Sequence, residues 1–149
     1  MEKALNNAAN INSDETSKNT TDAPRYSYED FLDIIAKLRA PGGCPWDMEQ
    51  THESLKKCLI EEAGEVIEAI DNKDNENLCE ELGDLLLQVV MHAQIAAEEG
   101  RFTMDDIIQG VSEKMVRRHP HVFGDAKVTS VEEGLDLWNA IKQQEKNRK

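Results

Sequence analysis

Residues 59–90 read LIEEAGEVIEAI (59–70), DNKDN (71–75) and ENLCEELGDLLLQVV (76–90), and this stretch decides the fold of the chain. In the first segment apolar residues recur at the spacing of an amphipathic helix, at Ile60, Ala63, Val66, Ile67 and Ile70. The second segment repeats the pattern at Leu78, Leu82, Leu85, Leu86, Val89 and Ala93. The polar stretch between them favours a turn, so we expect two antiparallel helices that form a hairpin.

Two pairs of acids lie on this predicted hairpin, Glu62 with Glu65 and Glu81 with Asp84. The members of each pair are three residues apart and share a helix face, and the two pairs are nearly equidistant from the turn. The four carboxylates should therefore lie at about the same height and repel one another unless a cation lies among them. Since no Cys or His joins them at ligand spacing, we expect a hard cation, Mg²⁺ first, with Mn²⁺ as a substitute.

Two further observations bear on this hypothesis. Gly64 and Gly83 lie inside the same helices, where each costs about 1 kcal/mol relative to alanine, and close approach of the other helix or of a ligand would explain them. Against a metal site stands the acidity of the chain, in which Asp and Glu make up 30 of 149 residues. Glutamates commonly cover a solvated helix face, so the acids alone leave both interpretations open.

Composition limits the class of protein. A net charge of −13 argues against a nucleic-acid polymer or an anionic membrane as the main partner. The sequence shows neither an apolar run of membrane-spanning length nor the order of a secretory signal. Three cysteines fit no disulfide framework or zinc pattern, so we expect reduced thiols in a cytoplasmic protein. Strand signals are nearly absent, which predicts an all-α fold.

The chain divides into a tail and one domain. Residues 1–24 are rich in Asn, Ser, Thr and Asp, and we expect a disordered tail there, followed by a single domain over residues 25–149. Capping signals at Ser27, Thr103 and Ser130 predict the starts of three helices, and Gly100 predicts the end of the second hairpin helix. The last residues, QQEKNRK (143–149), are expected to fray.

The loop PGGCPWDMEQT (41–51) carries a tryptophan, Trp46, in a segment that two prolines and two glycines make irregular. A large ring on such a loop either closes the end of the helical bundle or offers a flat surface to a base or sugar. The sequence alone favours the first interpretation slightly.

A basic group follows at the end of the helix predicted to start at Thr103: Lys114, Arg117 and Arg118. Cations there complement the helix dipole, but in so acidic a chain they also suit a triphosphate. Trp138 and Lys142 are one turn apart on the last helix and present a ring and a cation together, although a core tryptophan and a solvated lysine are an equal alternative. For His119 and His121 we expect structural hydrogen bonds.

Five motifs occur in order: GCPWDMEQTHESL (43–55), the acids of EExxE and ExxD (61–65 and 81–84), EEGRF (98–102), KMVRRHPHVF (114–123) and WNAIK (138–142). Together they make residues 27–142 resemble the MazG-type nucleoside triphosphate pyrophosphohydrolases, one branch of the all-α NTP pyrophosphatase superfamily. Many relatives carry two copies of this domain, and many have Glu at the position of Asn139.

The resemblance implies an all-α helical bundle around the metal-binding hairpin, completed by dimerisation or higher assembly, with sites that border the subunit interface. It implies Mg²⁺-dependent hydrolysis of nucleoside triphosphates, NTP or dNTP, to monophosphate and pyrophosphate. The implied metal ligands are Glu62, Glu65, Glu81 and Asp84, and Glu61 is our candidate for accepting a proton from the attacking water. The positions matched to substrate contact are Trp46, Lys114, Arg117, Arg118, Trp138 and Lys142.

Three other functions stay open at this point. A non-catalytic nucleotide sensor would use the same Mg²⁺ site without turnover, and a helical interaction module would use its acids only as a solvated surface. A substrate-selective relative would act on dUTP, dCTP or phosphoribosyl-ATP, because pocket selectivity depends on contacts that motif spacing does not reveal.

Overall fold

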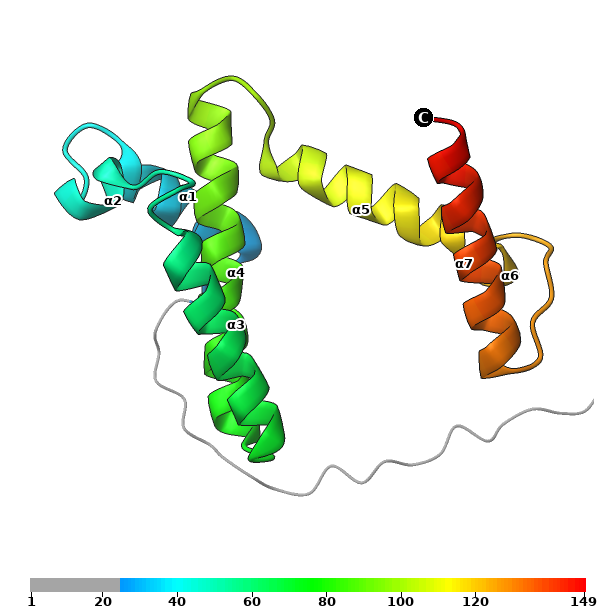
Figure 1. Cartoon of the computed structure of the whole chain (residues 1–149). Helices are drawn as coiled ribbons and strands as arrows, with labels where there is room; N and C mark the ends of the chain where they lie inside the picture. The colour runs from blue at the N-terminus through cyan, green and yellow to red at the C-terminus, as the bar shows by residue number, and fades with distance from the viewer. Residues whose placement is uncertain (1–24) are drawn as a thin grey trace, which may run out of the picture.

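The computed structural model describes residues 25–149, and these residues form seven α-helices and no strand (Figure 1). The helices are α1 (Tyr28–Arg39), α2 (Pro45–Glu49), α3 (Lys56–Asp71), α4 (Asn75–Glu98), α5 (Met104–Arg118), α6 (Pro120–Phe123) and α7 (Val131–Asn147). The predicted all-α class is confirmed. The tail predicted over residues 1–24 lies outside the described residues. Among the described helices, none combines the length and the apolar character needed to cross a membrane.

Helices α3 and α4 lie side by side and reverse direction at the polar turn between them (Figure 1). Lys73 takes a left-handed backbone conformation there (φ 55°), and Asp74 caps α4 by accepting a hydrogen bond from the Asn77 amide at 3.1 Å. Val66 and Ala69 of α3 are buried. These two small apolar side chains allow the helices to approach closely along the segment that carries the acids.

The main hydrophobic core lies at the other end of this helix pair, where α1 crosses α4. Its buried members are Ile35, Leu55, Val90, Met91 and Ile95. They come from α1, from the segment before α3 and from the C-terminal half of α4. This core holds α1 against α4. The turn end of the hairpin lies outside it and is held by contacts between α3 and α4.

Part of the apolar stripe predicted to face inward is exposed instead. Ile60 is 74% exposed and Ile67 is 59% exposed on α3, and Leu82 and Leu86 of α4 are also exposed. Within the described chain α3 packs against α4 alone, so one helix cannot cover the whole stripe. The hairpin therefore presents an uncovered apolar surface.

Helices α5, α6 and α7 form a C-terminal arm that leaves α4 after a turn at Gly100 (φ 68°) (Figure 1). Helix α7 packs across α5 at the end remote from α4, and none of the three helices contains a buried residue. With so little apolar burial, the arm depends on the ion pairs between α5 and α7.

The helix ends follow the predicted caps, with two differences. Capping boxes are present at Ser27 and Thr103, whereas at Ser130 the second half of the box is missing because Glu133 bonds to the backbone and hydroxyl of Thr129. The fraying predicted for residues 143–149 is wrong over most of that segment, since α7 continues to Asn147. In its last turns the carboxylate of Glu145 binds Arg117 and Arg118 of α5.

A pair of histidines joins the segment before α3 to α4. The Nδ1 atoms of His52 and His92 are 2.6 Å apart, and the rings are stacked. The Arg101 guanidinium donates to Nε2 of His52 at 2.5 Å, so this nitrogen must accept and the proton of His52 lies on Nδ1. His92 therefore accepts on Nδ1 and carries its proton on Nε2, an atom that is buried without a described partner.

This arrangement makes stability sensitive to pH. Burial lowers the pKa of His92 below its ordinary value, and the neighbouring His52 lowers it further. Below about pH 6.5 the unfolded chain binds a proton that the folded chain excludes, so stability falls as the pH drops. We expect the melting temperature of the wild type to fall between pH 7.5 and pH 5.5 by more than that of His92→Gln, measured by circular dichroism. Parallel curves for the two proteins would contradict this prediction.

Candidate functional site

Helices α3 and α4 bring three carboxylates together in the middle of the hairpin. One oxygen each of Glu62, Glu81 and Asp84 lies within 4.8 Å of the others, and all three residues are partly buried. Glu65 lies outside this 4.8 Å group but near enough that its carboxylate raises the pKa of both Glu62 and Glu81. We call these four residues the acidic cluster, and their convergence follows from the three-residue spacing on two antiparallel helices.

The carboxylates of the acidic cluster repel one another and are partly shielded from water, and both effects raise the pKa values of Glu62 and Glu81. Loss of hydration raises the pKa of Glu62, and the carboxylates of Glu65 and Asp84 raise it further. The pKa of Glu81 is raised in the same way, first by loss of hydration and then by Glu65. One oxygen of Glu81, Oε2, is buried and receives no hydrogen bond from the described residues.

The oxygen of Glu81 that has no described partner indicates whether a cation fits the cluster. Buried polar atoms normally have a partner, and in the described part of the chain no Lys or Arg reaches Oε2 of Glu81. Clustered carboxylate oxygens are the ligands that Mg²⁺ and Ca²⁺ prefer, so the donor set fits a hard divalent ion. Glu61 stands at the edge of the cluster, where it is exposed and pairs with Lys57 at 3.4 Å.

The two helix glycines are not explained by contact between the helices. A Cβ atom added to Gly64 or to Gly83 would meet nothing within 4 Å. The predicted close approach of the other helix is therefore wrong for one chain, because both glycines face open space.

The loop with Trp46 is anchored by one arginine. Arg39 at the end of α1 donates to the carbonyl oxygens of Asp47 and Gln50 at 2.5 and 3.0 Å, and its other edge binds both oxygens of Glu98. These bonds lower the pKa of Glu98 and tie the short helix α2 to α4. Trp46 itself is 58% exposed, so the interpretation that it closes the end of the bundle is wrong.

A basic pocket of about 560 Å³ lies in the C-terminal arm. Helix α5 contributes Lys114, Arg117 and Arg118, which are three of the predicted substrate-contacting residues. Helix α7 and the chain end contribute the rest of the lining: Lys142, Glu145, Lys146, Arg148 and Lys149. Ligand pockets typically have volumes of several hundred Å³, and the charge of this one suits an anion such as a polyphosphate.

Trp138 does not line this pocket but packs beside it. The Arg118 guanidinium lies over its ring with 5.0 Å to the centroid, and the His119 ring meets it edge-on. His119 also bonds through Nδ1 to the carbonyl oxygen of Met115, which is the structural role predicted for it. For His121 the prediction of a hydrogen bond is wrong at Nδ1, which is buried without a described partner.

The acidic cluster and the basic pocket lie on separate parts of the chain. The first belongs to α3 and α4, and the second to α5 and α7. Within residues 25–149, α7 packs against α5 and contacts neither α3 nor α4 (Figure 1). One chain therefore does not bring its predicted metal ligands and its predicted phosphate contacts to one place.

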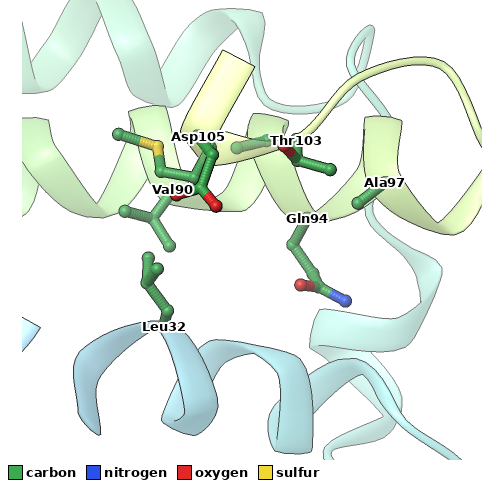
Figure 2. A pocket seen from close by; sticks show the side chains of 8 residues that line it. Leu32, Val90, Gln94, Ala97, Thr103 and Asp105 are labelled. Atoms are coloured by element: carbon green, nitrogen blue, oxygen red, sulfur yellow. The ribbon is translucent and has the colours of Figure 1, made fainter. Parts of the chain in front are cut away.

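A smaller cavity, of about 180 Å³, lies between α1, α4 and the start of α5. Figure 2 shows Leu32 of α1 and Val90 of α4 at one side of it, with Gln94 at the other. Asp105 is the one titratable group among the described residues of its lining, and no cation joins it. This cavity does not suit a charged nucleotide.

Sequence reasoning missed several residues that organise these regions. Glu145 joins α5 to α7, Arg39 anchors the Trp46 loop, and His52 pairs with His92. Only Glu145 left a signal, because it lies three residues after Lys142 and so shares its face of the helix. The other two act across long separations in sequence.

With this geometry established, the chain can be compared with known proteins. Residues 50–123 match the model of the MazG nucleotide pyrophosphohydrolase domain. The crystal structure of a mazG-related protein from Thermotoga maritima superposes with a TM-score of 0.64 at 35% identity, covering 77% of this chain and 98% of that one. The chain belongs to the MazG nucleotide pyrophosphohydrolase family.

Longer relatives agree with this assignment. The nucleoside triphosphate pyrophosphohydrolase/pyrophosphatase MazG of Thermotoga maritima is 56% identical over 82% of this chain, and the nucleoside triphosphate pyrophosphohydrolase of Escherichia coli K12 is 48% identical over 80%. The protein YabN of Bacillus subtilis is 57% identical over 82%. The matched region makes up 46%, 46% and 25% of these three relatives, so the chain spans half their length or less.

The acidic cluster leads to a prediction about metal binding. Mg²⁺ should raise the melting temperature of the wild type, because a ligand that binds only the folded state stabilises it by about 2.7 kcal/mol at 100 times its Kd. Glu81→Gln should lose most of this rise. In EDTA the same variant should melt above the wild type, since one of the mutually repelling charges is gone.

Glu68→Gln is the matched control, because Glu68 is exposed on α3 outside the cluster and its substitution removes the same charge. It should respond to Mg²⁺ as the wild type does. An equal Mg²⁺ response in Glu81→Gln would show that the cluster binds no metal.

Proposed function

We propose that this chain hydrolyses nucleoside triphosphates, NTP or dNTP, to the monophosphate and pyrophosphate, with Mg²⁺ as cofactor and Mn²⁺ as a substitute. The observation that carries the proposal is the acidic cluster, in which Glu62, Glu81 and Asp84 converge within 4.8 Å and one buried oxygen of Glu81 has no partner among the described residues. The names of the relatives from Thermotoga maritima and Escherichia coli support the reaction type.

The acidic cluster would hold the metal through Glu62, Glu65, Glu81 and Asp84. Mg²⁺ held there would supply Lewis-acid polarisation of the phosphates and would lower the pKa of a bound water. Glu61, beside the cluster, is our candidate for orienting the attacking water and accepting its proton. Its exposure and its weak pairing with Lys57 leave its carboxylate free to do so.

The basic pocket would receive the phosphates. Lys114, Arg118 and Lys142 offset the charge that grows on the leaving pyrophosphate, and Arg117 assists them. Trp46 offers an exposed ring to the base or sugar, on a loop that Arg39 holds in place. Trp138 contributes through Arg118, whose guanidinium it supports.

We further propose that the working unit is a dimer with two-fold symmetry or a higher oligomer. Two observations support this proposal: the basic pocket of one chain lies away from its own acidic cluster, and the apolar surface around Ile60 and Ile67 is uncovered. A second copy would cover this surface and would bring its own arm to the cluster. Each complete site would then combine α3 and α4 of one subunit with α5 and α7 of the other.

The reaction is tested by incubating the purified protein with each common NTP and dNTP plus Mg²⁺ and identifying the products. We expect monophosphate and pyrophosphate in equal amounts. Glu62→Gln and Asp84→Asn should reduce turnover at least about 100-fold without loss of helix content, because each removes a metal ligand. Glu68→Gln should retain the wild-type rate.

Other outcomes would point elsewhere. Release of orthophosphate would contradict the reaction, and nucleotide binding without turnover would indicate a sensor. Turnover of a single nucleotide in the panel would indicate a substrate-selective enzyme.

The shared site is tested by mixing two inactive variants. Glu62→Gln disables the acidic cluster, and Lys142→Ala weakens the basic pocket. If each site combines the two regions from different subunits, half of the dimers in a random mixture are hybrid and each has one intact site, so about one quarter of wild-type activity should return. If each site is built within one subunit, mixing should restore no activity.

A further inference from the structure

The basic pocket contains a single carboxylate among its cations, that of Glu145 on α7. The side chain is only 22% exposed, and it lies between two neighbouring arginines of α5. A negative charge in a pocket suited to phosphates requires an explanation, since it would repel the ligand unless it serves the cations around it.

Glu145 uses both of its oxygens on these arginines. Oε1 accepts from Nε of Arg117 at 2.5 Å, and Oε2 accepts from Nε and Nη2 of Arg118 at 3.2 and 2.7 Å. The two arginines lower the pKa of Glu145 to about 2, so the carboxylate stays charged at neutral pH. Each guanidinium is thus held by the edge that carries Nε.

The opposite edges of the guanidinium groups remain available. Each guanidinium has N–H donors on both Nη atoms, and no described residue accepts from those of Arg117 or from Nη1 of Arg118. Arg118 is fixed further because its plane rests on Trp138. A phosphate can therefore bind the free edges in the planar, two-bond manner that suits arginine, without displacing Glu145.

We propose that Glu145 is a positioning residue for the polyphosphate of the substrate, orienting Arg117 and Arg118 so that their Nη edges present donors to it. This inference rests on the proposed function, because it takes the basic pocket as the place where the phosphates bind. The competing possibility is that Glu145 occupies the phosphate position and must be displaced. The two possibilities predict opposite changes in phosphate affinity. Removing a positioning carboxylate weakens phosphate binding, whereas removing a carboxylate that occupies the phosphate position strengthens it.

The test measures the affinity of the full chain for inorganic pyrophosphate in the presence of Mg²⁺, by calorimetry, together with kcat and KM for a triphosphate. Glu145→Gln should weaken pyrophosphate binding at least about tenfold and raise KM by a similar factor, because the arginines lose a charged acceptor. Glu132→Gln is the matched control: it removes the same charge from the exposed start of α7, where Glu132 makes no ion pair with a described residue. It should leave affinity and kinetics unchanged.

A double-mutant cycle separates positioning from simple loss of structure. With both arginines replaced by lysine, adding Glu145→Gln should change pyrophosphate affinity less than about twofold, because its effect passes through them. A tenfold loss in that background would overturn the inference, and so would unchanged or tighter pyrophosphate binding by Glu145→Gln alone.

The pyrophosphate measurement also separates this inference from the proposed function. A wild-type chain that binds pyrophosphate but does not release it from triphosphates would contradict the proposed function, and the Glu145 comparison would still decide the inference. A wild-type chain that hydrolyses triphosphates but binds no pyrophosphate would overturn the inference alone.

Discussion

Repulsion between carboxylates at the centre of the α3–α4 hairpin is the constraint on which the rest of the structure depends. Close packing of the two helices, through small buried side chains such as Ala69, brings Glu62, Glu81 and Asp84 within 4.8 Å of one another. The same packing removes part of their hydration, which raises the pKa values of Glu62 and Glu81. Folding thus creates a cluster of carboxylates with no cation to neutralise it among the described residues.

Positive charge is concentrated far from that deficit. The core near Ile35 and Met91 stabilises the α1–α4 unit, whereas the arm that carries the cations has no buried residue. Ion pairs between Glu145 and the arginines of α5 join the two long helices of the arm. The chain is thus divided into one part that has a hydrophobic core and carries the acidic cluster, and a second part that carries the basic pocket and is held together by ion pairs. This division underlies the proposal of sites shared between subunits.

Much of this was predictable from sequence. Periodicity and caps located the helices. The three-residue spacing predicted that Glu62, Glu65, Glu81 and Asp84 lie at one height, and the structure brings Glu62, Glu81 and Asp84 together. The pattern could not tell which apolar face is covered, since the exposure of Ile60 and Ile67 depends on how many helices pack against α3, and α4 is its one neighbour among the described helices.

Contacts across long separations were equally beyond reach. The bonds of Arg39 to Glu98 and of His52 to His92 have no local signature, because neither partner is at helical spacing from the other. Motif resemblance identified the family, and the geometry of one chain then showed that the motifs occupy two places. The structural clue to a cation at the acidic cluster is the buried oxygen of Glu81 that has no partner among the described residues.

The arm also bears on how the chain reaches its native state. Two of the helix pairs, α3 with α4 and α5 with α7, are close in sequence, so little chain entropy is lost in closing the loops between them and both pairs can form rapidly. If a second copy covers the uncovered faces, the last step of assembly is bimolecular, and its rate rises with protein concentration. Newly made chains would then pass through a monomeric intermediate with a completed hairpin and an undocked arm, which at low concentration would be the longest-lived species on the route.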